Sequence, residues 1–234
     1  ALQQAGIEAQ GVAGFSLGEV AALTFAQAFD QQQGMELVCH RARWMQQCAE
    51  ESRAGMLAVL KLSQEQVEQL CGQFSQVYPV NYNCPGQQVI TGETQALLEM
   101  IPKLKENGAK VIPLKVSGPF HSPFMKPAGE KLERELEQVR LSELQIPYVS
   151  NVSAQPITKT EQIRSLLSRG VYSPVKWEQS MRTMLAEGVE YFVEIGPGHT
   201  LSTLLKKINA EAKICTVSTM EDLVRMQDFL NETV

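Results

Sequence analysis

The chain has neither an excess of basic residues nor a long apolar run. Its 21 lysines and arginines are outnumbered by 26 aspartates and glutamates, which gives a formal net charge of −5. Proteins that bind nucleic acid usually present a basic surface, so this balance argues against nucleic acid as the main partner. No apolar run approaches the ~20 residues that cross a bilayer, and no signal peptide is recognisable. We therefore expect a cytoplasmic protein with no membrane partner.

Cysteine and histidine are also scarce, and they do not cluster. The five cysteines stand at wide, irregular spacings without a Cys-x-x-Cys pair, and there are three histidines. Zinc sites are recognised in a sequence by closely spaced pairs of these residues, so we expect no metal centre. An odd number of scattered cysteines favours free thiols in a reducing compartment over a disulfide framework.

What the chain does have is a regular alternation of strand-like and helix-like segments. This alternation predicts an α/β fold with a mainly parallel sheet. A chain of 234 residues can hold one large domain with a smaller one inserted in it. In the large domain, helices are expected over about 19–29, 34–52, 123–139 and 199–208, and strands over 147–150, 191–195 and 213–217.

Residues 54–116 follow a pattern of their own. Strand-like runs at 56–60, 77–82, 88–91 and 110–114 are separated by two helix-like runs, the first capped by Ser63 and the second over 94–107. The order βαββαβ is the ferredoxin-like pattern. We therefore predict a ferredoxin-like small domain at 54–116, inserted in a large α/β domain at 1–53 and 117–234.

The most informative segment is Gly14–Glu19, with the sequence GFSLGE. It follows a short apolar run and opens a helix-forming stretch, so Ser16 lies at a strand-to-helix corner, as in the G-x-S-x-G nucleophile elbow. Glycine at 14 and 18 avoids β-carbons that would crowd the approach of strand and helix. The helix N-terminus would place N–H groups beside the serine, where an oxyanion forms. This corner makes the large domain hydrolase-like.

A nucleophilic serine needs a base, and the three histidines are its candidates. His40 falls within a predicted helix, where a surface or packed role is the simpler interpretation, and His199 stands at a helix start. His121 belongs to the loop at 117–123, which holds two prolines and follows a strand. A loop residue can reach into a cleft without helix constraints. His121 is therefore our candidate base.

Five motifs resemble those of the acyltransferase family of fatty acid and polyketide synthesis, to which malonyl-CoA:acyl carrier protein transacylase belongs. In the family's order they are Gly14–Glu19, Arg41–Gln46, Asn81–Gln87, Pro119–Ser122 and Glu194–Gly198, and the resemblance covers essentially all of residues 1–208. It implies ping-pong transfer of malonyl from CoA, through Ser16, to the phosphopantetheine thiol of acyl carrier protein in fatty acid biosynthesis. No cofactor is implied beyond the substrate malonyl-CoA.

The resemblance also implies roles for residues around the serine. His121 would take the serine proton and return it to the departing thiol. A main-chain carbonyl orients the histidine in this family, and the matching position is Gly170, where glutamine is usual. The N–H of Leu17 would be the first oxyanion donor. Glu19 is expected to support the helix N-terminus rather than to react.

Three further residues match substrate-binding positions. Arg41 falls where the family has the arginine that binds the malonyl carboxylate, and a guanidinium suits that partner, although the residues alone would make it a solvated helix charge. Phe120 stands where related polyketide enzymes selective for malonyl have phenylalanine, and core packing explains it too. Asn83 would line the cleft, or simply stabilise the turn that follows it.

Besides Gly170, the chain departs from the family in two further places. Phe15 replaces the usual histidine of Gly-His-Ser, which bears on the polarity of the pocket. Residues 1–6 resemble the last turn of a helix, and the family's Gly-Gln-Gly-type loop with a second oxyanion donor does not precede the elbow. We therefore expect the C-terminal part of a longer protein.

Three functions remain as alternatives to malonyl transfer in fatty acid biosynthesis. They are a polyketide synthase acyltransferase domain, a serine hydrolase or thioesterase using the same elbow, and a domain that only docks carrier protein.

Overall fold

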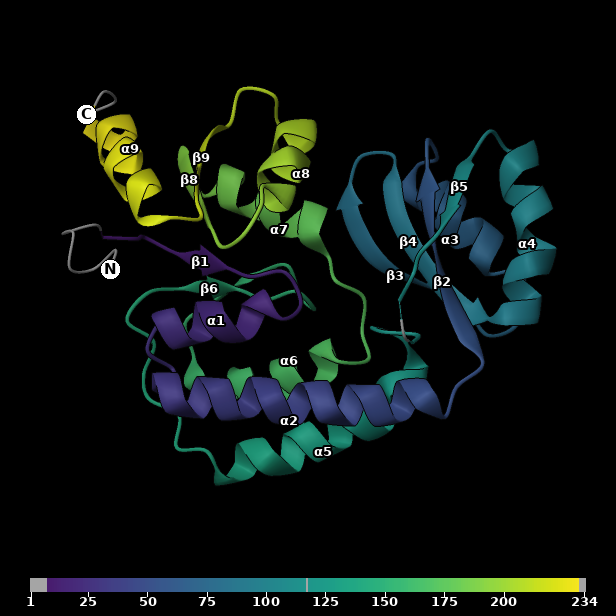
Figure 1. Ribbon diagram of the computed structural model, residues 1–234, viewed down its shortest axis with the longest axis horizontal. Coiled ribbons are helices and arrows are strands. Elements are labelled where there is room, and N and C mark those ends of the chain that lie inside the picture. The colour runs from purple at the N-terminus through teal and green to yellow at the C-terminus, as the bar shows by residue number, and fades with distance from the viewer. Residues whose placement is uncertain (1–7, 117, 232–234) are drawn as a thin grey trace.

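The computed structural model describes residues 8–116 and 118–231, and the helical turn expected at 1–6 lies outside them. The chain forms two parts that lie side by side (Figure 1). The smaller part contains β2 (Ala54–Leu60), α3 (Gln64–Cys71), β3 (Val77–Cys84), β4 (Gln87–Glu93), α4 (Thr94–Glu106) and β5 (Lys110–Pro113). The chain leaves the larger part once to form this unit and then returns to it.

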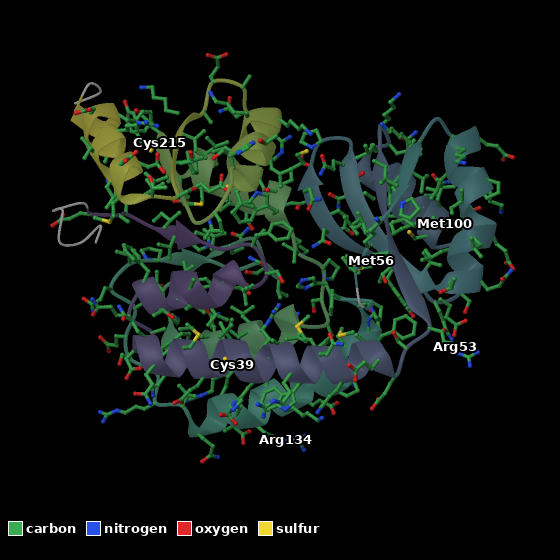
Figure 2. All side chains as sticks on the ribbon, in the orientation of Figure 1. Cys39, Arg53, Met56, Met100, Arg134 and Cys215 are labelled. Carbon is green, nitrogen blue, oxygen red and sulfur yellow. The ribbon has the colours of Figure 1, made fainter. Side chains whose placement is uncertain are left out.

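The smaller part is an antiparallel sheet with helices on one face. Its strand order is β3-β4-β2-β5, and every neighbouring pair is antiparallel. Because side chains alternate between the faces of a strand, Leu57 packs with the helices, whereas Met56 packs with Val80 and Phe120 toward the larger part. Met100 of α4, labelled in Figure 2, belongs to the cluster on the helix side.

The strands of the larger part form two short sheets. β1 (Val12–Ala13) pairs in parallel with β6 (Tyr148–Val149), and β8 (Tyr191–Ile195) pairs in parallel with β9 (Lys213–Val217). The prediction of a mainly parallel sheet is incomplete, because β7 (Pro156–Ile157) was not expected and runs antiparallel to β6. The connection between β6 and β7 is too short for the crossover that a parallel pair requires, so the chain returns as a hairpin.

Helices pack around these strands and bury the main core. The largest cluster of buried apolar side chains joins Leu23 of α1 (Gly18–Phe25), Met45 of α2 (Gln31–Glu50), Leu136 of α5 (Lys126–Gln138) and Ile163 of α6 (Ile163–Gly170) with Tyr148 of β6. In Figure 1, α2, α5 and α6 run beside one another below β1 and β6. The helices of this part are α1 (Gly18–Phe25), α2 (Gln31–Glu50), α5 (Lys126–Gln138), α6 (Ile163–Gly170), α7 (Trp177–Ala186), α8 (Thr200–Ile208) and α9 (Met220–Asn231).

Capping residues decide where several of these helices begin. The helix expected from residue 34 begins at Gln31, because Asp30 accepts a hydrogen bond from the Gln33 N–H at 2.8 Å and forms a capping box with it. The helix expected over 19–29 already ends at Phe25. The predicted cap at Ser63 is confirmed, since its hydroxyl accepts from the Gln66 N–H at 3.3 Å.

The structure also bears on the cysteines and on membrane spans. All five cysteines are free thiols, and Figure 2 shows Cys39 and Cys215 far apart in the larger part. Among the described helices, none combines the length and the hydropathy that a bilayer crossing would require. In the same residues, no group of three or more histidine, cysteine, aspartate or glutamate side chains is placed to hold a metal ion.

Both glycines of the elbow were expected to avoid crowding, but only Gly14 has no room for a β-carbon. A pair of variants tests this difference. A methyl group on Gly14 would overlap the carbonyl group of Gly18, whereas one on Gly18 would meet nothing within 4 Å. We expect Gly14→Ala to lower the free energy of unfolding by about 2–4 kcal/mol. Gly18→Ala should leave it unchanged or raise it by up to about 1 kcal/mol, since alanine favours a helix. Urea denaturation measures both, and equal losses would refute the assignment.

Candidate active site

Ser16 lies at the corner between β1, which ends at Ala13, and α1, which begins at Gly18. Its φ is 51°, in the left-handed region that residues other than glycine rarely adopt. Backbone of this kind persists only where the surrounding structure holds it, and it is concentrated at functional sites. The corner therefore has the geometry expected of a nucleophile elbow.

The Ser16 hydroxyl is hydrogen-bonded to His121, which comes from the loop before α5. Ser16 Oγ lies 2.7 Å from His121 Nε2. His121 Nδ1 lies 2.8 Å from the carbonyl oxygen of Gly170, the last residue of α6. A carbonyl only accepts hydrogen bonds, so Nδ1 carries the proton and Nε2 presents its lone pair to the serine hydroxyl. The structure thus brings Ser16, His121 and Gly170 together.

The surroundings of His121 keep its imidazole neutral. The side chain is buried, and burial together with the positive charge of Arg41 lowers its pKa to about 4. At neutral pH the ring therefore carries no charge, which is the state in which Nε2 can accept a proton from serine. Gly170 stands where the family usually has glutamine. This change keeps the contact that orients His121, because the contact uses the backbone carbonyl of residue 170.

Arg41 of α2 also contacts the nucleophile. Its side chain is buried, and Nη2 donates a hydrogen bond to Ser16 Oγ at 2.9 Å. The interpretation of Arg41 as a solvated helix charge is therefore wrong, whereas Arg43 on the same helix is exposed. A buried guanidinium beside the nucleophile is placed to receive a carboxylate, since it presents planar paired donors.

Of the Ser16 and Leu17 N–H groups, one is a free donor. The Ser16 N–H donates to Asn151 Oδ1 at 2.7 Å, so it is already engaged. The N–H of Leu17 has no hydrogen-bond acceptor within the described residues, and Leu17 directly precedes the first residue of α1. A free N–H next to the nucleophile, at a helix N-terminus, suits an oxyanion.

The remaining predicted residues lie at the junction of the two parts or away from the serine. Phe120 is half-buried and packs against the main core and against Met56 of the small sheet. Asn83 is buried in β3, and its Oδ1 has no hydrogen-bond partner in the described part of the chain. His40 pairs with Glu135 at 3.0 Å, and His199 is exposed at the start of α8.

Phe15 occupies an apolar environment beside the elbow. Its ring packs edge-on against Trp177, with 5.5 Å between the ring centroids. Both residues belong to the cluster formed by α7, α8, β8 and β9. The phenylalanine that replaces the family's histidine therefore joins the elbow to this second core.

Two polar residues of the site, Glu19 and Asn151, make contacts that were not expected from the sequence. Glu19 lies in the first turn of α1 as expected, but its carboxylate points inward, is 3% exposed, and accepts a hydrogen bond from the Asn151 N–H at 2.8 Å. Besides lying at the helix N-terminus, Glu19 therefore also holds Asn151. Asn151 is the second residue after β6, which lies beside the strand that leads to Ser16. A polar residue just after a buried strand is a signal that could have found it, because sites gather at the carboxyl ends of parallel strands.

Glu19 should make the stability of the protein depend on pH. Burial raises its pKa from 4.5 to about 7, although Arg41 and the Asn151 N–H oppose this shift. Between these two pH values the folded protein keeps a proton that the unfolded chain has released, so this group makes the free energy of unfolding fall as pH rises. Glu19→Gln removes the effect.

We therefore expect the free energy of unfolding of Glu19→Gln, relative to the wild type, to rise between pH 4.5 and 7 by up to about 3 kcal/mol. Urea denaturation of both proteins at several pH values measures the difference. His121, whose pKa is shifted downward, is present in both proteins, so its contribution largely cancels. A difference that is constant with pH would contradict a raised pKa of Glu19.

The fold and the contacts of Ser16 show to which class of enzyme the protein belongs. This is an α/β protein in which a serine on a strained strand-to-helix corner is paired with a neutral histidine, the arrangement of enzymes that form an acyl-serine intermediate.

Comparison with known proteins defines the family. Residues 1–227 match the acyl transferase domain family, and the chain belongs to it. Malonyl CoA-acyl carrier protein transacylase of Bacillus subtilis (strain 168) is 39% identical over 226 residues, which cover 94% of this chain and 71% of the relative. The crystal structure of malonyl CoA-acyl carrier protein transacylase from Clostridium perfringens is 36% identical, with a TM-score of 0.95 over 99% of this chain and 74% of that one.

A second similar structure contains another protein as well. It is a malonyl-transacylase in complex with a type II polyketide acyl-carrier protein, 36% identical to this chain, with a TM-score of 0.92 over 97% of this chain and 75% of that one. The membership predicted from the five sequence motifs is thus confirmed.

Proposed function

We propose that this chain transfers a malonyl group from malonyl-CoA to the phosphopantetheine thiol of acyl carrier protein, in fatty acid biosynthesis. The observation that carries the proposal is the position of the Ser16 hydroxyl, which lies 2.7 Å from His121 Nε2 and 2.9 Å from Arg41 Nη2. A nucleophile, a base and a carboxylate-binding cation thus meet at one oxygen. The names of the related proteins agree with this reaction.

In the first half-reaction, Ser16 Oγ attacks the thioester carbonyl carbon of malonyl-CoA while its proton passes to His121 Nε2. The Leu17 N–H stabilises the oxyanion that develops. Collapse of this intermediate breaks the carbon–sulfur bond, and the CoA thiolate takes the proton from the imidazolium. The Gly170 carbonyl, which accepts from Nδ1, stabilises the transient positive charge on the ring. The product is a malonyl-serine ester.

The second half-reaction reverses these steps with another thiol. The phosphopantetheine thiol of the carrier protein gives its proton to His121 and attacks the ester carbonyl carbon. The tetrahedral intermediate expels Ser16 Oγ, which takes the proton back. The chain's own side chains supply the nucleophile and the base, so we propose that no cofactor or metal takes part. We propose the cytoplasm as the place of the reaction.

Recognition of malonyl-CoA would come from residues on three segments. Arg41 would pair with the free carboxylate of the malonyl group. Phe120, at the junction of the two parts, would fill the space that an α-methyl group needs, a bias of about 1–3 kcal/mol. Asn83, whose buried Oδ1 lacks a partner among the described residues, would bind a donor group of the substrate.

The architecture supports a division into two domains. We propose a hydrolase-like large domain at 1–53 and 117–234, and a ferredoxin-like small domain at 54–116. The elbow supports the first assignment. The order βαββαβ, with the strand order β3-β4-β2-β5, supports the second. The contacts of Phe120 with both parts would place the substrate between them.

A direct assay tests the proposed reaction. The purified protein is incubated with malonyl-CoA, with and without holo acyl carrier protein, and products are identified by mass spectrometry. We expect a malonyl adduct on the protein that is absent in Ser16→Ala, and malonyl carrier protein when the acceptor is present. Free malonate as the only product would refute the transferase in favour of a hydrolase. Running fatty acid and type II polyketide carrier proteins in parallel decides which acceptor is used.

A further inference from the structure

The side chain of Asn151 bridges the two sides of the elbow. Its Oδ1 accepts from the Ser16 N–H at 2.7 Å, and its Nδ2 donates to the Gly14 carbonyl oxygen at 2.7 Å. An N–H can only donate and a carbonyl can only accept, so these partners determine the orientation of the amide. The two hydrogen bonds enclose the residues whose backbone turns from strand to helix, including Ser16 with its φ of 51°.

Asn151 is itself held in place from two other directions. Its N–H donates to Glu19 Oε1 at 2.8 Å, and its carbonyl accepts from the Lys176 N–H at 3.0 Å. Asn151 is 2% exposed and Glu19 is 3% exposed, so water does not compete for these contacts. The amide is thus anchored both to the helix that follows the nucleophile and to the segment that leads into α7.

We propose that Asn151, held by Glu19, is a positioning residue that keeps Ser16 in its strained conformation; the proposal rests on the acyl transfer proposed above. The strained φ needs outside support, and the Asn151 amide holds the backbone on either side of Phe15. By engaging the Ser16 N–H, the amide also keeps the corner turned so that the hydroxyl meets His121 and the Leu17 N–H stays free for the oxyanion.

The proposal predicts a slower reaction at sites that remain intact. In Asn151→Ala, the rate constant for acylation of Ser16 at saturating malonyl-CoA should fall by about 100-fold, as misplacement of a reacting group by about 1 Å does. Rapid-quench intact mass spectrometry gives this rate constant together with the fraction of molecules that react. The malonyl-CoA concentration at half-saturation should change by less than about threefold, because Asn151 is buried and its amide is engaged by the backbone of Gly14 and Ser16.

A control variant separates positioning from stability. Thr183 Oγ1 donates to the Ala154 carbonyl at 2.8 Å and so supports the same loop without contacting Asn151 or Ser16. Thr183→Val should lower the melting temperature while leaving the acylation rate constant within about twofold of the wild type. If Asn151→Ala lowers only the reacting fraction and the melting temperature, and its rate constant per active site stays near the wild-type value, the proposal is refuted.

A second variant keeps the test open if Asn151→Ala does not fold. Asn151→Asp has nearly the same volume and retains the acceptor for the Ser16 N–H, but it loses the donor to Gly14. Its rate constant should lie between those of the wild type and the alanine variant. An aspartate variant as fast as the wild type would show that the bond to Gly14 is dispensable and would overturn the proposal as stated.

A serine-directed fluorophosphonate probe separates this proposal from the proposed function. The probe reports the nucleophilicity of Ser16 without malonyl-CoA or carrier protein. If the wild type reacts with the probe but is not malonylated, the proposed function fails, and the ratio of probe labelling rates between wild type and Asn151→Ala still tests the positioning role. Equal labelling rates in the two proteins would count against Asn151 in either case.

Discussion

His121→Ala lowers the rate of Ser16 malonylation by about 10³-fold or more in the result we expect. The imidazole is the only base within hydrogen-bond reach of Ser16 Oγ among the described residues, at 2.7 Å, and its Nδ1 is held by the Gly170 carbonyl. Without it, the serine hydroxyl must lose its proton to water. Quenched-flow intact mass spectrometry with malonyl-CoA measures the rate of adduct formation.

His199→Ala is the matched control for this experiment. His199 is exposed at the start of α8 and makes no side-chain capping bond there, so its loss should leave the rate near the wild-type value. Circular dichroism and the melting temperature would show that both variants are folded. If a folded His121→Ala protein retained more than about a tenth of the wild-type rate, His121 would not be the general base.

Arg41→Ala should reduce loading of malonyl far more than loading of acetyl. A charge-assisted pair in a buried pocket favours the substrate with a carboxylate by about 2–4 kcal/mol, which corresponds to a factor of about 30 to 1000. Arg41 also donates to Ser16 Oγ at 2.9 Å, so both rates should fall to some degree. The quantity to measure is therefore the ratio of kcat/KM for malonyl-CoA and acetyl-CoA.

Arg43→Ala provides the comparison, because Arg43 lies on the same helix but is exposed. Its ratio should match the wild-type ratio. Arg41→Lys keeps the positive charge but loses the planar pair of donors, and we expect it to recover only part of the selectivity. Equal losses for malonyl and acetyl in Arg41→Ala would show that Arg41 acts on the serine alone and would remove it from substrate recognition.

Much of the local structure could be predicted from the sequence, because it depends on neighbours along the chain. The cap at Ser63, the order βαββαβ and the elbow at Ser16 all follow from spacings of a few residues. The errors are also local in origin. The capping box between Asp30 and Gln33 starts α2 earlier than its apolar pattern suggests, and a short turn after β6 returns the chain as β7.

The site needed more than spacing. Ser16 and His121 are 105 residues apart, and Asn151 is 135 residues from Ser16. Their partnership was anticipated only where the family resemblance supplied it, as for His121 and Gly170. The position of Asn151 just after a buried strand marks it as a candidate, but nothing local shows that it contacts Ser16, and nothing local shows that the Glu19 carboxylate turns inward.

Residue types and their spacing along the chain show which residues could turn, cap and react: a serine between glycines, an arginine on the second helix after it, and a histidine in a proline-containing loop. Folding of the whole chain is what brings these groups to one oxygen, buries Arg41 while Arg43 stays exposed, and places the Asn151 amide on the backbone of the elbow. Turns and caps form between near neighbours, whereas burial, pKa shifts and long-range hydrogen bonds exist only after the core has packed.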